Sequence, residues 1–134
     1  MNKEIYKIEI KKVLTSIDAT EEKLMMVFDD STTIEFSSYH EQDCCESVFA
    51  DFSPLKYHKE QLEGKHVREL VIKEVSEIGI LFSYEMEYTE YAKVFVPCYN
   101  YQNGYYSDDL ELLIRVGEEK TRIDISSAVE EHID

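Results

Sequence analysis

The amino-acid sequence predicts an α+β fold, in which one helix accompanies a mainly antiparallel sheet of about seven strands. Three observations lead to this prediction. Apolar and polar residues alternate with period two over most of the chain, which is the pattern of half-buried strands. Short runs of turn-forming residues separate these segments, which favours antiparallel neighbours. One segment only has the start and stop residues of a helix. At 134 residues, we expect residues 1–134 to form a single globular domain.

The first three strands are expected in the first forty residues. Glu4–Val13 alternates apolar and charged side chains, so it presents one apolar face. Lys23–Phe28 and Thr33–Ser37 flank a run of turn formers, Asp-Asp-Ser-Thr, which predicts a hairpin. The segment His40–Asp51 has no clear period, and we assign it no regular structure.

The helix is expected from Pro54 to about Glu63. Ser53 can cap its N-terminus, and proline is well tolerated at the first helical position. Gly64 suits the position after the last turn, where the backbone often becomes left-handed.

The second half of the chain is expected to form strands. The segments are Val67–Val75, Ile78–Met86, Lys93–Tyr101, Leu110–Val116 and Thr121–Ser126. The first of these could also be drawn as a helix. Pro97 cannot donate a hydrogen bond, so its strand should be an edge strand or bulged there. Asn103-Gly104 signals a hairpin or a longer loop. Ser126 or Ser127 could cap a short final helix through His132.

The charge of the chain restricts the classes of partner. Fourteen Lys and Arg face 29 Asp and Glu, which gives a formal net charge of −15. Such a surface repels nucleic acids and anionic lipids, so we expect no direct nucleic-acid binding and no membrane binding. Basic proteins are the expected partners. The chain has no apolar run long enough to span a membrane, and we expect no signal peptide. Three cysteines do not suggest a disulfide framework, and reduced thiols in a cytoplasm are expected.

The segment 74–90 is the candidate binding surface. It carries five glutamates and no Lys or Arg, and tyrosines are concentrated in and after it. Tyrosine contributes apolar contact area at low entropic cost, which carboxylates alone lack. We predict that a basic protein binds these residues: Glu74, Glu77, Glu85, Glu87, Glu90, Tyr84, Tyr88 and Tyr91.

A cluster of potential metal ligands and nucleophiles contains His40, Asp43, Cys44 and Cys45. Adjacent residues in an extended chain point to opposite sides, so the two cysteines would not easily share a zinc ion. A cysteine nucleophile with a histidine base would need an orienting third group. Three residues could complete a site only if folding brought them close: His58, His66 and Cys98. We therefore expect no metal site, no cofactor and no catalytic residues.

Two short blocks, Asp43-Cys44-Cys45-Glu46 and Asn103-Gly104-Tyr105-Tyr106, occur together in this chain. This pairing resembles a family of uncharacterised small proteins common in bacteriophages, prophages and actinobacterial genomes. The resemblance spans roughly residues 5–116. It implies a compact β-rich domain of mobile-element origin, which would act in the cytoplasm of a host bacterial cell. It implies no catalytic residue.

Three functions are compatible with these features. The first is a non-catalytic phage or mobile-element accessory protein that inhibits a host protein, for example a defence effector, by imitating nucleic acid with its acidic, tyrosine-rich surface. The second is a homo-oligomeric protein that sequesters a nucleotide immune signal. Its tyrosines would stack on a base, and its few cations would meet phosphate. The third is a small metal- or thiol-dependent enzyme. The candidate ligand-binding residues of the second function are Asn103, Tyr105, Tyr106 and Arg115.

Overall fold

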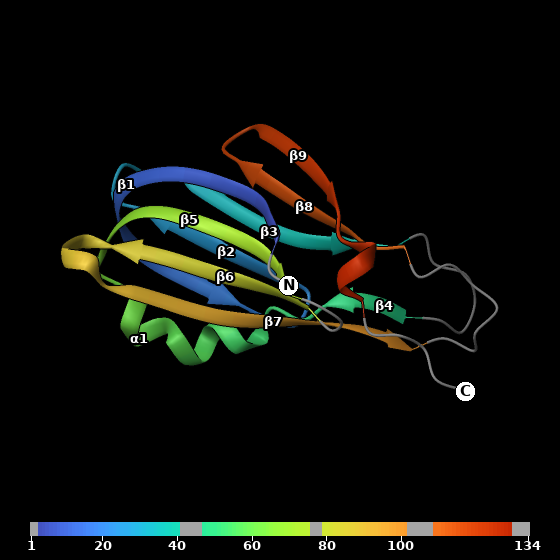
Figure 1. The fold of residues 1–134 in the computed structure, drawn as a ribbon. Coiled ribbons are helices and arrows are strands. Elements are labelled where there is room, and N and C mark those ends of the chain that lie inside the picture. The colour runs from blue at the N-terminus through green and yellow to red at the C-terminus, as the bar shows by residue number, and fades with distance from the viewer. Residues whose placement is uncertain (1–2, 41–46, 76–78, 102–108, 130–134) are drawn as a thin grey trace.

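A computed structural model describes residues 3–40, 47–75, 79–101 and 109–129. Within these residues, nine strands form one sheet in the order β4-β7-β6-β5-β1-β2-β3-β8-β9, and every neighbouring pair is antiparallel (Figure 1). The predicted antiparallel sheet and single helix are confirmed, whereas the predicted number of about seven strands is wrong. The strands are β1 Lys3–Ala19, β2 Lys23–Phe28, β3 Thr33–Tyr39, β4 Ser47–Ala50, β5 His66–Val75, β6 Gly79–Met86, β7 Tyr91–Tyr101, β8 Glu111–Val116 and β9 Glu119–Asp124.

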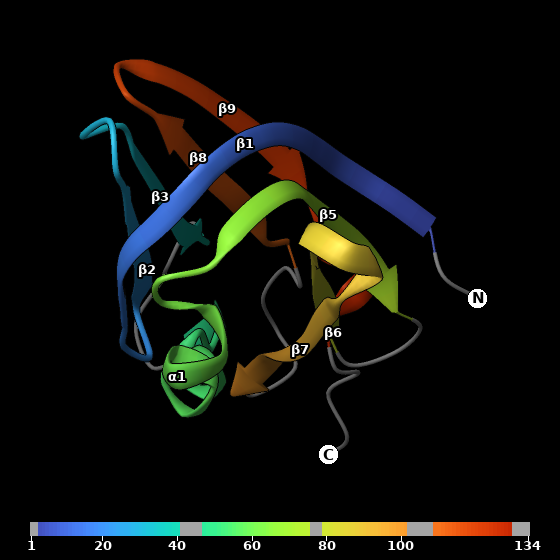
Figure 2. The ribbon, with the colours of Figure 1, turned by 90° about the vertical axis from the view of Figure 1, so that its left-hand side faces the viewer.

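The first strand, β1, bends the sheet into two halves. Its N-terminal part pairs with β5, and its C-terminal part, from Leu14 onward, pairs with β2. The pairing register shifts between Glu9 and Lys12, and Lys11 has a φ of +54°. Such a bulge bends a strand and increases its twist. The strand therefore continues well past the predicted end at Val13, and the sheet curls around the core (Figure 2).

The two halves of the sheet enclose one hydrophobic core. Phe82 on β6 meets Phe36 on β3 edge to face, with ring centroids 5.0 Å apart. The Tyr84 hydroxyl donates to the Met26 sulfur at 3.4 Å, which links β6 to β2. Phe52, just before the helix, also packs edge to face against Phe82, with ring centroids 6.2 Å apart. Burial of these aromatic side chains supplies much of the driving force for folding.

The predicted helix lies in its expected place. The segment begins as a 3₁₀ helix, η1 (Ser53–His58), and continues as α1 (Lys59–Leu62). It buries Leu55 and Leu62 against the core, and Figure 1 shows it on one side of the curled sheet, beside β7. Gly64 follows with a φ of +80°, as expected for a glycine stop.

The start of this helix differs from the prediction. Ser53 is not the N-cap: that position is Phe52, and no side chain caps it. Instead, the Asp51 carboxylate accepts a hydrogen bond from the Ser53 amide at 2.9 Å. The first six residues form a tight 3₁₀ helix, which has a proline at its start and no serine cap.

The sequence analysis missed strand β4, because a strand of four residues is too short to show a clear alternation of apolar and polar side chains. It pairs with the last four residues of β7, so that β7 is an edge strand only before Cys98. Pro97 lies at this boundary, and its carbonyl accepts from the Asp51 amide. Because the amide and carbonyl of one strand residue face the same side, the missing N–H of Pro97 faces away from β6. The described β6–β7 pairing extends to Pro97, opposite Gly79, without a bulge.

The C-terminal part is a hairpin followed by one helical turn. Strand β9 begins at Glu119, two residues before its predicted start, because Gly117 and Glu118 alone make the turn. A 3₁₀ helix, η3 (Ser126–Ala128), replaces the beginning of the predicted final helix. The rest of that helix and the Asn103-Gly104 turn lie outside the described residues. In the described part of the chain, no helix has the length and apolar character needed to cross a membrane.

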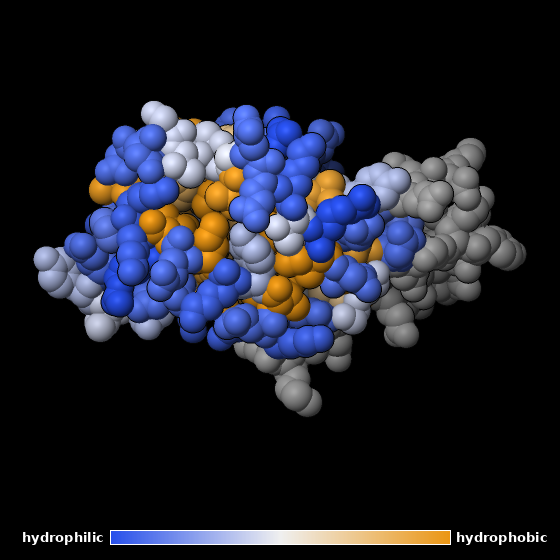
Figure 3. Space-filling view, turned by 90° about the horizontal axis from the view of Figure 1, so that it is seen from above, coloured by the Kyte–Doolittle hydropathy of each residue, from blue (hydrophilic) through white to orange (hydrophobic). Residues whose placement is uncertain are grey.

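The sheet stays open between the N-terminal part of β1 and the edge strand β9. Half-buried apolar residues pack against the core there, and Figure 3, which looks down on β1 and β9, shows apolar surface among hydrophilic residues. Burial raises the pKa of Tyr6 on β1, and the carboxylate of Glu119 on β9 raises it further. The two strands are therefore close enough for their side chains to interact electrostatically.

Candidate functional site

One residue of the predicted binding surface is wrong: Tyr84 cannot contact a partner. Its side chain is fully buried, and burial raises the pKa of its hydroxyl. In β6, the residues Ile80, Phe82 and Tyr84 all face the core because alternate strand residues share a face. The same alternation in the sequence could have excluded Tyr84.

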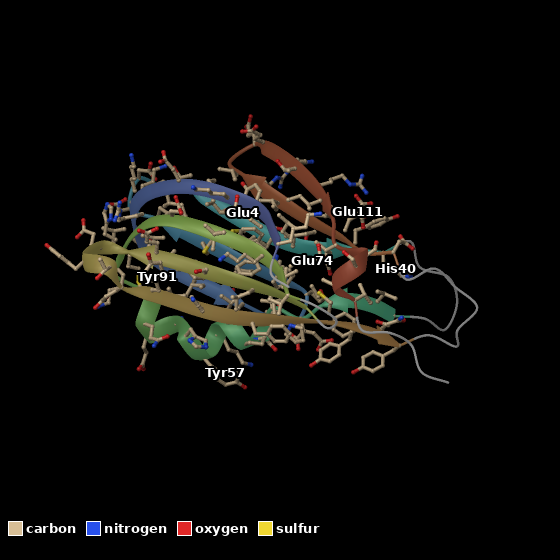
Figure 4. The ribbon with its side chains drawn as sticks, in the orientation of Figure 1. Glu4, His40, Tyr57, Glu74, Tyr91 and Glu111 are labelled. Carbon is tan, nitrogen blue, oxygen red and sulfur yellow. The ribbon has the colours of Figure 1, made fainter. Side chains whose placement is uncertain are left out.

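The predicted glutamates do not form one continuous surface. Glu74 pairs with the buried Ile80 and faces inward, where Ser127 donates to its carboxylate. Glu85 pairs with Glu69 on the outer face of the sheet. Five residues of strand separate the two positions, or about 17 Å at ~3.3 Å per residue. Figure 4 likewise shows Glu74 far from Tyr91. Glu77 lies outside the described residues.

The remaining predicted residues gather around the β6–β7 turn. We call the set Glu85, Glu87, Tyr88, Glu90 and Tyr91 the acidic hairpin end. Tyr88 is 90% exposed and Tyr91 is 58% exposed. Glu85 lies 3.4 Å from the Arg68 guanidinium, and Glu87 lies 3.5 Å from the His66 ring. Glu90 has no ion pair among the described residues.

The turn at this end is strained. Tyr88 has φ 60° and ψ 37°, and Thr89 has φ 61°. Two successive left-handed residues are typical of a type I′ hairpin turn, where Asn-Gly is favoured. For residues other than glycine, this conformation costs about 1–2 kcal/mol each. Backbone strain of this kind is concentrated at functional sites in proteins.

A groove adjoins the acidic hairpin end, between it and α1. Its volume is about 510 Å³. The lining residues are Glu60, Gln61, Lys65, Met86, Glu90, Tyr91 and Ala92. Two carboxylates and one ammonium group give the groove a negative balance, so it can accept a cationic side chain.

A second groove lies on the outer face of β3, β8 and β9, and we call it the cationic groove. Its volume is about 570 Å³. Its lining residues are Glu35, Ser37, Tyr39, Leu113, Ile114, Arg115, Lys120, Thr121 and Arg122. Of the predicted ligand-binding residues it contains Arg115. The other three, Asn103, Tyr105 and Tyr106, lie outside the described residues.

The sequence analysis missed Lys120 and Tyr39 as lining residues of the groove that contains Arg115. The missed signal was the two-residue turn: with Gly117 and Glu118 alone between the strands, Arg115 lies directly opposite Lys120. Tyr39 could not be placed in this way, because β3 and β8 are distant in the sequence.

The structure describes only part of the cluster of potential metal ligands and nucleophiles, at which we expected no site. His40 is buried, and its Nδ1 lies 2.6 Å from the carbonyl oxygen of Asp109. Asp43, Cys44 and Cys45 lie outside the described residues. The three residues that could have completed a site lie on separate elements, η1, β5 and β7: His58, His66 and Cys98. Over residues 3–40, 47–75, 79–101 and 109–129, no three His, Cys, Asp or Glu side chains are placed to hold a metal ion.

Cys98 is poorly suited to nucleophilic chemistry. Its side chain is buried in β7, and burial, with the nearby Glu74 carboxylate, raises the pKa of its thiol to about 12. The thiolate is the reactive form of cysteine, and this thiol is protonated near neutral pH.

Comparison of the chain with protein-family models, with curated proteins and with solved structures finds no match.

Proposed function

We propose that this protein is a non-catalytic binding protein whose acidic hairpin end docks on a basic protein. The observation that carries the proposal is Tyr88, an almost fully exposed ring on a strained turn between Glu87 and Glu90. The partner would be a host protein that itself binds nucleic acid, for example a defence effector. In this proposal the chain is a mobile-element accessory protein that inhibits this partner in the bacterial cytoplasm, in agreement with the family resemblance.

Charge would bring the partners together. The net charge of −15 gives the whole molecule a field that attracts cations, and Glu87 and Glu90 bring carboxylates to its projecting end. Carboxylates at this end present the same sign of charge as nucleic-acid phosphates. This attraction accelerates encounter and weakens with salt, over a Debye length of about 8 Å at physiological ionic strength.

The tyrosines would hold the complex together. Tyr88 offers most of its ring to a partner, and Tyr91 borders the groove beside α1. A lysine or arginine of the partner could enter this groove and meet Glu60 and Glu90. Aromatic anchors beside a pocket commonly supply most of the binding energy of an interface.

The test is affinity capture from a host lysate with the full chain, followed by mass spectrometry and kinetic measurement on the purified partner. The variant Glu87→Lys with Glu90→Lys should reduce the association rate by about tenfold or more at low salt. Tyr88→Ala should mainly accelerate dissociation.

The matched control is Glu21→Lys with Glu22→Lys, which changes the charge equally at the exposed β1–β2 turn. This control should keep most of the association rate. Equal losses in the two double variants would mean that net charge alone attracts the partner. A partner that ignores both the hairpin substitutions and salt would refute the docking surface.

A further inference from the structure

The cationic groove is unusual in a chain with twice as many acidic as basic residues. Register places its side chains in rows across β3, β8 and β9, because directly paired residues share a face. One row is Glu35, Arg115 and Lys120, and the next is Ser37, Leu113 and Arg122. The lining thus places three cations and one carboxylate around the half-buried Leu113, which forms an apolar floor, and a further carboxylate, Glu111, pairs with Arg122.

Arg115 differs from the other two arginines of the chain. Arg68 pairs with Glu85, and Arg122 makes two hydrogen bonds of 2.9 Å to the carboxylate of Glu111. Arg115 has no ion pair with any described residue, although Glu35 lies opposite it on β3. Its guanidinium can donate several hydrogen bonds to a ligand.

Lys120 also has no ion pair in the described part of the chain, and it lies directly opposite Arg115. Like charges in directly opposed positions destabilise a sheet. Edge strands often carry lysine to prevent aggregation, which could explain Lys120 on β9. It cannot explain Arg115, because β8 is paired on both sides. An anion bound between these two cations would remove their repulsion.

Tyr39 and Arg122 form the other wall. The Arg122 guanidinium lies 5.5 Å from the centre of the Tyr39 ring, and it is held by the two hydrogen bonds that it donates to the Glu111 carboxylate. Tyr39 is 46% exposed, so part of its ring is accessible to a ligand. The wall therefore combines a planar guanidinium and an aromatic ring, both of which stack on flat ligands.

We propose that the cationic groove binds a small organic phosphate, whose phosphate group lies between Arg115 and Lys120. The organic part is a planar ring that covers Leu113 beside Tyr39. The groove volume of about 570 Å³ lies within the range of small-molecule sites. This site lies on different strands from the acidic hairpin end and does not depend on the proposed protein partner.

The test is titration calorimetry of the full chain with AMP as the probe, and with ribose 5-phosphate, adenosine and inorganic phosphate for comparison. AMP should bind most tightly, because it alone of the four supplies both the phosphate and the ring. The double variant Arg115→Met with Lys120→Met should weaken AMP binding by about tenfold or more, since hydrogen bonds to charged groups each contribute strongly.

Two further variants make the test specific. Lys73→Met with Lys93→Met removes two cations from the outer face of the other half of the sheet and should leave AMP binding unchanged. Glu35→Gln removes the one carboxylate of the groove lining and should tighten AMP binding, the opposite direction from general damage to the fold.

Three results would overturn the proposal. One is the absence of AMP binding at millimolar concentration. Another is adenosine binding as tightly as AMP, which would remove the role of the phosphate. The third is equal weakening in the groove variant and in the Lys73/Lys93 control, which would leave only non-specific charge attraction.

Discussion

The β6–β7 and β8–β9 hairpins both contain left-handed backbone at their turns, but they place different residues there. The β6–β7 connection has three residues, Glu87–Thr89, and the β8–β9 connection has two, Gly117 and Glu118, and both contain left-handed backbone. The β8–β9 turn uses Gly117, which adopts a φ of +60° at no steric cost. The β6–β7 turn uses Tyr88 and Thr89, which do not favour this conformation. This difference supports the proposal that the strained β6–β7 turn presents its side chains to a partner.

The two hairpins also show how little net charge says about a local surface. The acidic hairpin end carries carboxylates, as the charge of −15 would suggest. The β8–β9 hairpin carries Arg115, Lys120 and Arg122 on its outer face, together with Glu111 and Asp124. We propose a basic protein as the partner of the first surface and an anion as the ligand of the second.

The largest expected effect separates Tyr84 from Tyr88, four residues later in the chain. Tyr84→Ala should lower the free energy of unfolding by about 3–5 kcal/mol, because it leaves a cavity in the core. Tyr88→Ala should change it by less than about 0.5 kcal/mol, because the ring is exposed. Urea unfolding followed by circular dichroism measures both. Similar losses in the two variants would contradict the assignment of Tyr88 to the surface.

The second prediction replaces the strained turn with the residues that it favours. Tyr88→Asn with Thr89→Gly should raise the free energy of unfolding by about 1–2 kcal/mol, through relief of left-handed strain. The same variant should bind the basic partner less tightly, since it lacks the ring. A gain in stability without any loss of binding would mean that the strain serves another purpose.

The third prediction introduces strain into the relaxed turn. Gly117→Ala should lower the free energy of unfolding by about 1 kcal/mol. The loss would come from backbone strain alone, because a Cβ there would meet no atom within 4 Å. Gly117→Asn should cost less, since asparagine tolerates the left-handed region. Thermal unfolding compares the two variants. Equal losses of stability in the Ala and Asn variants would show that the left-handed φ of Gly117 does not cause the loss.

The smallest effect concerns a third hairpin, β2–β3. Hydrogen bonds from Thr32, together with Lys12, lower the pKa of Asp30 to about 2. A lowered pKa in the folded state means that this carboxylate stabilises the fold above its ordinary pKa of 3.8, and that the contribution disappears as the pH falls through about 2. In an NMR titration, Asp30 should remain ionised at about pH 3, where exposed glutamates are mostly protonated. A midpoint near 3.8 would show that the Thr32 contacts do not persist in solution.

Most strands and the helix could be predicted because their signals are local. Alternation and turn residues located β2, β3, β6 and β8 closely, and the Ser-Pro…Gly pattern located the helix. Strand β4 was missed because four residues have too few alternations to recognise. Its pairing with the end of β7 defines it, and that partner lies some fifty residues later.

The sequence by itself determined the charge, the strand periods and the exposed chemistry of the β6–β7 turn. Only the tertiary structure decided which of these residues share a surface. The register of β5 against β6 set Glu74 opposite Ile80 on the inner face and Glu85 opposite Glu69 on the outer face, which separated two residues that the sequence had placed in one acidic run. Pairing of β3 with β8 brought Tyr39 beside Arg122. The physical reason is that a side chain's face follows from local backbone geometry, whereas its neighbours across the sheet follow from strand pairings between distant segments.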